Sequence, residues 1–264
     1  PRTLLRPVMR YVLQIAYDGT DFAGSQRQPA ARTVQGELER AAAQIGTFSR
    51  VTLSGRTDAG VHAAAQVGQT DGETPVPPEK LAEVLSRQLP ADVKVLKSAL
   101  APEGFDCTRA VRKKTYCYRF YCARTPHPLL ARYAARMDRT PDRDAMRAVL
   151  PLLTGEHDFA AFRATGSSAK TTVRTLYELT ADCIDLYGVP VYEIRVTGNG
   201  FLYNMVRILA GELYAVGCGI ADASDVEKAL RTGRRDLLYR TLPAEGLMLE
   251  QVDYGIPLFG EERP

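Results

Sequence analysis

The chain of 264 residues has no tryptophan, only three histidines, and no apolar run approaching the roughly 20 residues needed to cross a bilayer. It also shows no secretory signal, because Leu4-Leu5 is too short for the apolar region of such a signal. The five cysteines are odd in number and lack Cys-x-x-Cys spacing, which favours reduced thiols over a disulfide framework. We therefore expect a cytoplasmic protein that makes no membrane contact.

Motifs for metals and nucleotide cofactors are missing as well. His62, His127 and His157 stand at no metal-ligand spacing from one another or from a cysteine, so we expect no zinc site. The Gly-x-Gly pairs at Gly198 and Gly217 lack the third glycine of a dinucleotide-binding turn, and there is no Gly-Lys-Ser/Thr phosphate loop. We therefore expect no metal and no cofactor.

What the sequence does contain is typical of a soluble globular protein, with 45% hydrophobic and 25% charged residues. The length allows a sizeable core in one large or two smaller domains. Net charge is only +3, but the cations gather in two stretches. Clustered cations favour a phosphate backbone, although solvated surface charge explains each cluster equally well. The first stretch holds Arg109, Arg112, Lys113, Lys114 and Arg119, and the second Arg231, Arg234 and Arg235.

Hydrophobic periodicity predicts an α+β chain built from two related mixed halves that divide near Arg112. Residues 1–8 are expected to be an extension or a remnant of cloning, residues 9–112 the first half, residues 113–254 the second half, and residues 255–264 a tail. Strands are predicted over residues 11–17, 51–53, 64–69, 93–95, 115–122, 173–183 and 191–196. Helices are predicted after Thr33, Pro77, Asp142 and Asn204 and around residues 226–230.

The octapeptide Gly55-Arg56-Thr57-Asp58-Ala59-Gly60-Val61-His62 lies between two predicted strands and is the most informative segment. Its glycines permit a sharp turn or a close backbone approach, so Asp58 is expected on a tight loop. A carboxylate beside a guanidinium such as Arg56 stays ionised at neutral pH, which makes Asp58 a candidate nucleophile. An ordinary hairpin loop with a surface ion pair fits the same residues.

Tyr116 and Tyr118 are two residues apart and therefore share one face of a predicted strand. Such a pair is either part of an aromatic core or a platform on which a nucleic-acid base stacks. The residues alone leave both readings open.

Several further blocks occur in order between about Tyr11 and Tyr254. Together with the octapeptide they resemble the TruA family of tRNA pseudouridine synthases. The blocks are Tyr17-Asp18-Gly19-Thr20 with Phe22-Ala23-Gly24, Thr33-Val34-Gln35-Gly36-Glu37-Leu38-Glu39, Tyr116-Cys117-Tyr118, Gly200-Phe201-Leu202-Tyr203-Asn204-Met205-Val206-Arg207 and Ala244-Glu245-Gly246-Leu247-Met248-Leu249.

This resemblance implies the pseudouridine synthase fold, with a central, largely antiparallel sheet and flanking helices. It also implies a homodimer that isomerises uridine to pseudouridine in the anticodon stem-loop of tRNA, at nucleotides 38 to 40, without a cofactor. The chain departs from the family pattern at three places. Ser25 stands where tryptophan is common, Phe105-Asp106-Cys107-Thr108 replaces Phe-His-Ala-Arg, and Asn204 replaces histidine.

By the same resemblance Asp58 attacks either C6 of the base or C1′ of the ribose, and Tyr116 stacks on the uracil. Arg56 and Arg207 keep Asp58 ionised and oriented, and Arg56 helps to displace the target base. Leu247 and Leu249 form apolar walls that exclude water. Arg112, Lys113 and Lys114 come just before the Tyr116 strand, and this position, rather than the resemblance, leads us to expect them at the entrance for the RNA backbone.

Two rival functions stay open. One is a non-catalytic RNA-binding module, against which the intact Arg56-Thr57-Asp58 segment speaks, because mere binding needs no nucleophile. The other is a small-molecule isomerase that uses the same aspartate, for which the basic clusters would have no use.

Overall fold

The computed structural model describes residues 8–166 and 169–260. All of the predicted extension except Val8, including Leu4-Leu5, lies outside the described residues, as do residues 261–264 of the predicted tail. The chain forms two compact units, one from Pro1–Arg112 with Leu249–Pro264 and the other from Lys113–Met248. The segment that begins at Leu249 thus belongs to the first unit, whereas the sequence pattern assigned residues 113–254 to the second half.

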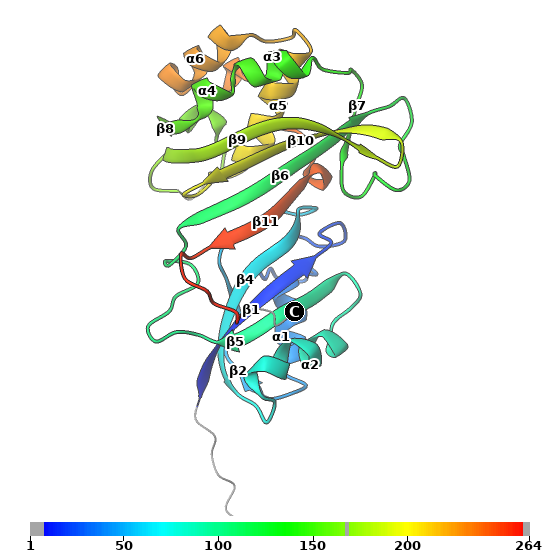
Figure 1. The fold of residues 1–264 in the computed structure, drawn as a ribbon. Helices are drawn as coiled ribbons and strands as arrows, with labels where there is room; N and C mark the ends of the chain where they lie inside the picture. Colours follow the sequence, from blue (N-terminus) through cyan, green and yellow to red (C-terminus); the bar gives the residue numbers. More distant parts are fainter. Residues whose placement is uncertain (1–7, 167–168, 261–264) are drawn as a thin grey trace, which may run out of the picture. The chain divides into compact units, whose positions relative to one another are not determined.

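The sheet of the first unit contains three long antiparallel strands in the order β5 (Val93–Leu100), β1 (Met9–Tyr17) and β4 (His62–Glu73) (Figure 1). The short strands β2 (Thr47–Phe48) and β3 (Thr52–Leu53) also pair with β4. Strand β11 (Leu247–Asp253) follows β4 in the strand order, and its residues from Leu249 onward belong to this unit.

Two helices bury apolar faces in the first unit. Helix α1 (Val34–Ala42) begins where predicted, because the Thr33 hydroxyl accepts a hydrogen bond from the backbone N–H of Gly36 at 3.2 Å. Helix α2 (Leu81–Gln88) follows a 3-10 turn, η1 (Pro78–Lys80). The side chains that α1 and α2 bury include Val34, Leu38, Ala41, Leu81 and Leu85.

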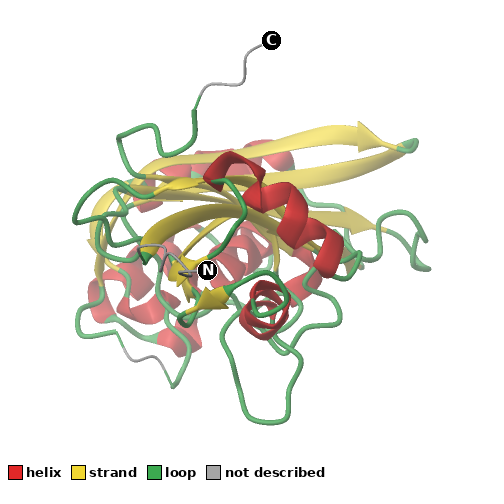
Figure 2. Ribbon diagram, turned by 90° about the horizontal axis from the view of Figure 1, so that it is seen from below, coloured by secondary structure: helices red, strands yellow, loops and turns green. Residues whose placement is uncertain are grey.

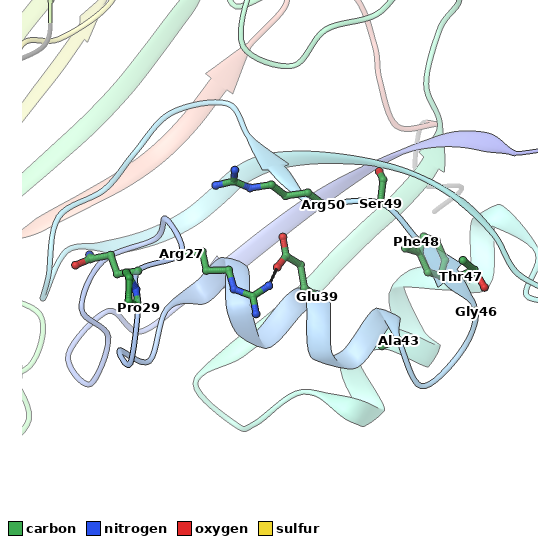
Figure 3. Close-up of a pocket in the computed structure, with 10 residues that line it drawn as sticks. Arg27, Pro29, Glu39, Ala43, Gly46, Thr47, Phe48, Ser49 and Arg50 are labelled. Carbon is green, nitrogen blue, oxygen red and sulfur yellow. Dashed lines mark hydrogen bonds and ion pairs between the residues drawn. The ribbon is translucent and has the colours of Figure 1, made fainter.

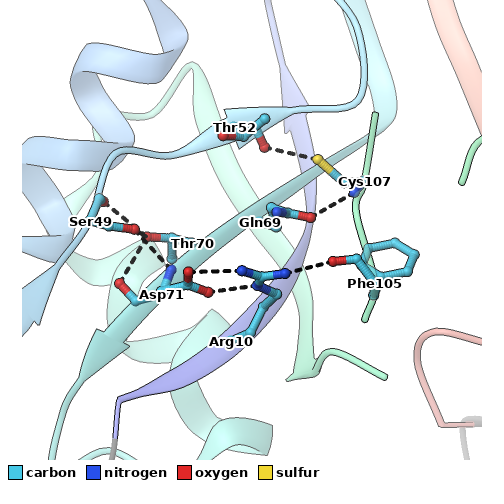
Figure 4. A network of polar contacts seen from close by, with 8 residues as sticks. All are labelled: Arg10, Ser49, Thr52, Gln69, Thr70, Asp71, Phe105 and Cys107. Atoms are coloured by element: carbon cyan, nitrogen blue, oxygen red, sulfur yellow. Dashed lines mark hydrogen bonds and ion pairs between the residues drawn. The ribbon is translucent and has the colours of Figure 1, made fainter. Parts of the chain in front are cut away.

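A polar network fixes the irregular segment that follows β5 (Figure 4). The Arg10 guanidinium donates two hydrogen bonds to the Asp71 carboxylate, at 2.7 and 3.0 Å, and a third to the Phe105 carbonyl at 2.9 Å. The side-chain carbonyl of Gln69 accepts the backbone N–H of Cys107 at 2.6 Å. Residues 105–107 are therefore held on the sheet although they belong to no strand.

The second unit has the antiparallel strand order β6 (Lys113–Cys122), β10 (Val189–Gly198), β9 (Val173–Leu186) and β8 (Gly155–Asp158). Strand β7 (Ala135–Met137) pairs with β6 in parallel. Strands β9 and β10 form a hairpin, visible as a long two-stranded ribbon in Figure 2. Its turn residues, Tyr187 and Gly188, have φ of 59° and 76°, as a two-residue type I′ turn requires.

The helices of the second unit are α3 (Arg143–Ala148), α4 (Leu150–Leu153), α5 (Met205–Gly217) and α6 (Ala223–Thr232), which lie on one side of β9 and β10 in Figure 1. Three 3-10 turns accompany them, η2 (Ala160–Phe162), η3 (Arg235–Leu237) and η4 (Ala244–Gly246). The single helix predicted after Asp142 is wrong. Pro151 has no N–H to continue the hydrogen bonds of α3, so that helix ends before Val149 and a second helix, α4, begins after it.

These elements confirm the predicted α+β class with mostly antiparallel strands. Among the described residues, no helix combines the length and the apolarity needed to span a membrane.

Candidate active site

The octapeptide, hereafter the Asp58 loop (Gly55–His62), forms the tight turn that its glycines predict. The backbone N–H of Val61 donates to the Asp58 carbonyl at 3.2 Å, which closes a four-residue turn. Gly60 occupies its third position with φ of 80°, a conformation that a type II turn requires and that glycine adopts without strain. Asp58 is half-buried at the first position of this turn.

Buried polar side chains hold the loop at Thr57, the residue before Asp58. The Thr57 N–H donates to the Ser25 hydroxyl at 2.8 Å, and the Ser25 N–H donates to the Thr57 carbonyl at 3.0 Å. The Thr57 hydroxyl lies 2.7 Å from the hydroxyl of Tyr17 on β1. Burial raises the pKa of Tyr17 to about 12, so this phenol stays protonated. Ser25, one of the departures from the family pattern, therefore positions the loop.

His62 closes the other end of the Asp58 loop. Its ring is 1% exposed, and Nδ1 accepts the backbone N–H of Gly19 at 3.0 Å. A Cβ at Gly19 would collide with the carbonyl oxygen of Val61, so glycine is required for this approach. His62 thus attaches the residue 18–20 turn to the loop, which is a positioning role.

Arg56 points into solvent from the same loop. Its guanidinium makes no hydrogen bond or ion pair with the part of the chain that the structure describes, Asp58 included. The side chain is therefore available to a bound ligand.

In the second unit, Tyr116 on β6 packs edge-to-face against Phe201, with ring centroids 5.1 Å apart. Tyr118, two residues on, is fully buried and donates its hydroxyl to the Pro243 carbonyl at 2.8 Å. Burial raises the pKa of Tyr118 well above its ordinary value. Tyr118 is thus a core residue, and Tyr116, nearer the start of the strand on the same face, is also buried, at 8% exposed.

Arg207, in the first turn of α5, is oriented by two contacts. Its Nε donates to the Leu242 carbonyl at 2.7 Å, and Nη1 donates to the Asn204 side-chain oxygen at 2.8 Å. Asn204 precedes the helix with φ of 59°, a left-handed conformation that asparagine tolerates better than most residues. Asn204, a departure from the family pattern, therefore has two roles: it adopts the left-handed conformation before α5, and its side chain orients Arg207.

The sequence-predicted site residues divide between the two units. The first unit contains Asp58, Arg56, Arg112 and Leu249, and the second contains Tyr116, Arg207, Leu247, Lys113 and Lys114. Leu247 and Leu249 are 7% and 1% exposed and share one face of β11, as their alternate positions predict.

The first basic stretch does not form a single surface. Lys113 and Lys114 are consecutive residues of β6, so their side chains leave opposite faces of the strand. Lys114 shares the face of Tyr116. Lys113 lies 5.3 Å above the ring of Tyr177. Arg112 is exposed beside Gly255.

The second basic stretch is largely engaged within the protein. Arg234 forms an ion pair with Asp236. Arg235 donates to the Leu238 carbonyl at 3.0 Å and to the Thr241 hydroxyl at 3.2 Å, and burial lowers its pKa. Arg231 on α6 is exposed and makes no hydrogen bond or ion pair with the described residues.

Sequence reasoning missed the hollows around α1. One of about 770 Å³ is shown in Figure 3, where Arg50 lies above the ion pair of Arg27 with Glu39. Another of about 350 Å³ adjoins the Asp58 loop and is lined by Arg50, Arg56 and Thr108, among others. No local motif marks Arg50, which is a single arginine between short strands. Within the described ranges, no group of three or more His, Cys, Asp or Glu residues could hold a metal ion.

Comparison with known proteins identifies the class. Residues 14–108 and 150–255 match the family described as tRNA pseudouridine synthase. The chain therefore belongs to this family of isomerases, and the TruA resemblance of its sequence blocks is confirmed.

Individual relatives agree over nearly the whole chain. The tRNA pseudouridine synthase A of Shouchella clausii (strain KSM-K16) is 39% identical over 260 residues, which are 97% of each chain. That of Bacillus velezensis (strain DSM 23117) is 41% identical over 250 residues, 93% of this chain and 99% of the relative. The chain also aligns with a chain of the crystal structure of a Cbf5-Nop10-Gar1 complex, at 10% identity and a TM-score of 0.37 over 94% of this chain and 50% of that one, a likeness too weak to relate the two folds.

Proposed function

We propose that this protein isomerises uridine to pseudouridine in the anticodon arm of tRNA, with Asp58 as the nucleophile. The observation that carries the proposal is the rigid presentation of a half-buried carboxylate on a turn that buried polar side chains hold from both ends. Such positioning favours attack by the carboxylate, because the entropy cost of bringing the nucleophile and the reacting atom together has already been met.

The reaction breaks the N1–C1′ bond, turns the uracil, and forms a C5–C1′ bond. C5 loses a proton and N1 gains one, so nothing is added or removed overall. The chemistry involves no redox change and no external group, and it therefore calls for no cofactor. The attack of Asp58 at C6 of the base and its attack at C1′ of the ribose both fit this balance.

The other site residues take supporting roles in this proposal. Tyr116 stacks on the uracil once the base has left its helix, and Arg56 helps to displace that base. Arg207, already oriented by Leu242 and Asn204, holds the carboxylate ionised. Leu247 and Leu249 exclude water.

We further propose that the protein works in the cytoplasm as a homodimer, with Arg112 and Lys114 contacting the RNA backbone. Relatives named tRNA pseudouridine synthase A support tRNA as the substrate. The rival RNA-binding module would bind tRNA without changing it, and the rival small-molecule isomerase would show no salt-dependent affinity for tRNA.

The test is to incubate the purified chain with an unmodified tRNA transcript and to map pseudouridine by carbodiimide treatment and primer extension. We expect stops in the anticodon arm, with activity that survives exhaustive chelation by EDTA when the tRNA remains folded. A transcript that is bound but never modified would favour the binding module. Activity that is lost on chelation and restored by a metal would show that a metal takes part.

A further inference from the structure

A pocket of about 350 Å³ adjoins the Asp58 loop within the first unit. Its volume is at the lower end of the roughly 300–1,000 Å³ typical of ligand sites. Gly55 and Arg56 line one side, and Ser25 and Gln26 line another. Because Ser25 exchanges hydrogen bonds with the backbone of Thr57, this pocket, hereafter the Arg50 pocket, shares a wall with the segment that carries Asp58.

The lining of the Arg50 pocket is suited to binding an anion. Two exposed guanidinium groups line it, those of Arg50 and Arg56, and neither makes a hydrogen bond or an ion pair with any described residue. The Gln26 amide and the Thr108 hydroxyl add further hydrogen-bonding groups. None of the described lining residues is acidic. A guanidinium presents a planar set of donors that matches the oxygens of a phosphate.

The larger hollow next to it is lined by Arg50 as well, but it also holds Glu39, and its other arginine, Arg27, is already paired. Arg27 donates to the Glu39 carboxylate at 2.5 Å (Figure 3). The same carboxylate accepts the backbone N–H of Val51 at 3.1 Å and the side-chain amide of Gln35 at 2.9 Å. Glu39 therefore neutralises the charge of Arg27 and also holds the backbone of Val51, the residue next to Arg50.

The opposite wall is fixed as well. Thr108 follows Cys107, whose backbone N–H is held by Gln69 and whose thiol donates to the Thr52 carbonyl at 3.3 Å (Figure 4). Asp106 accepts the backbone N–H of Thr108 at 2.8 Å. The backbone on these two sides of the pocket is thus held in place, at Val51 and at residues 107–108.

We propose that the Arg50 pocket binds a phosphodiester group immediately next to the target uridine, with Arg50 as its principal cation. This inference rests on the proposed function. If Asp58 attacks the target nucleotide, the two phosphodiesters that flank that nucleotide are the anions nearest to the loop. The wall shared through Thr57 places the pocket beside that position. Arg50 would then fix the register of the RNA, because phosphate contacts position a strand without reading its sequence.

The first test measures affinity for an unmodified tRNA transcript by filter binding over a range of salt concentrations. Asp58→Asn protein is used throughout, so that the RNA is not converted. Adding Arg50→Gln should weaken binding roughly tenfold, as the loss of a charge-assisted hydrogen bond does. The slope of log affinity against log salt should become shallower by about one. Arg87→Gln is the matched control, since it removes the same charge from an exposed ion pair on α2.

The second test locates the phosphate with anticodon stem-loop RNAs that carry one uncharged methylphosphonate linkage, either 5′ or 3′ of the target uridine. One of the two linkages should weaken binding to protein that retains Arg50 and should leave binding to the Arg50→Gln protein unchanged. Such a double-mutant cycle isolates the pairwise contact. In otherwise unaltered enzyme, Arg50→Gln should raise KM for tRNA and leave kcat within about twofold.

The proposal is overturned if Arg50→Gln behaves like Arg87→Gln, or if neither linkage couples to Arg50. These affinities do not depend on turnover. Absence of pseudouridine formation by the unaltered enzyme would overturn the proposed function, whereas coupling between Arg50 and one linkage would still establish the phosphate contact.

Discussion

The two units hold their functional side chains by different means. In the first unit, hydrogen bonds between buried polar groups hold the Asp58 loop, through Ser25, Thr57 and Tyr17. In the second unit, Tyr116 packs against the ring of Phe201, whereas Arg207 is held by hydrogen bonds to Leu242 and Asn204. The hydrogen-bonded arrangements depend on direction, and the packing of Tyr116 depends on volume.

This difference determines what substitutions reveal. A polar network fails when one partner is lost, but it tolerates changes to a side chain that projects from it. An apolar core tolerates changes that conserve volume and responds to lost volume or to buried charge. Four predictions, taken from the largest expected effect to the smallest, test this contrast.

Asp58→Asn should abolish turnover while tRNA affinity stays within a few-fold of the unaltered enzyme. An amide has the shape of the carboxylate but is no nucleophile, and hydrogen bonds of Thr57 and His62 hold the loop on either side of Asp58. Carbodiimide mapping and filter binding measure the two quantities, with exposed Asp138→Asn as the control. Substantial pseudouridine formation by Asp58→Asn would refute the mechanism.

Tyr116→Ala should lower kcat/KM far more than Tyr116→Phe. Loss of a stacking ring costs roughly 1–3 kcal/mol, whereas phenylalanine keeps both the ring and its contact with Phe201. Steady-state kinetics on a tRNA transcript, with thermal melting of each variant, separate activity from folding. Equal losses in the two variants would assign the role to the hydroxyl and refute stacking.

Lys114→Gln should make the salt slope of tRNA binding shallower by about one, and Lys113→Gln should change it less. The reason is strand alternation, which puts only Lys114 on the face of Tyr116. Filter binding at several salt concentrations measures both slopes, and each variant serves as the control for the other. Equal changes in the two slopes would show that both lysines meet phosphates.

Glu212→Gln should raise Tm by a few degrees at pH 8 and by less at pH 4.5. Glu212 is fully buried on α5; Oε2 accepts the backbone N–H of Tyr239 at 2.7 Å, and Oε1 has no partner among the described residues. Burial raises its pKa in the folded state, so its contribution to stability is present below the unfolded pKa and is lost as pH rises through the folded pKa.

Calorimetry at both pH values checks this, with exposed Glu227→Gln on α6 as the control. A Tm difference between Glu212→Gln and the unaltered protein that does not depend on pH would contradict the assignment.

Much of the fold could be predicted because its signals are local. The Thr33 cap, the Tyr187-Gly188 turn and the Asn204 helix start each depend on residues close in sequence. The single helix predicted after Asp142 was wrong because apolar spacing alone ignores the missing N–H of Pro151. Strand β7 was not predicted, since three residues are too short to show alternation.

The candidate site was predicted unevenly for the same reason. The Asp58 loop has a local signature in its glycines, whereas Arg50 becomes a candidate only through the pocket that it lines together with Gln26 and Thr108 from other segments. Conversely, Arg234 and Arg235 are adjacent in sequence, yet Arg234 forms an exposed ion pair with Asp236 and Arg235 donates to the Leu238 carbonyl. The clustering of arginines along a chain therefore does not tell whether their guanidinium groups are available to a ligand.

The return of the chain at Leu249 has a consequence for biosynthesis. The first unit needs Leu249–Pro264, and the hydroxyl of Tyr254 donates to the Cys107 carbonyl at 2.8 Å. The second unit, in contrast, is one continuous stretch. On a ribosome that adds about 5–20 residues per second, the part made first must therefore wait several seconds for its last strand. Thr108 in the wall of the Arg50 pocket follows Cys107, so the contact with Tyr254 that holds this wall forms late in synthesis.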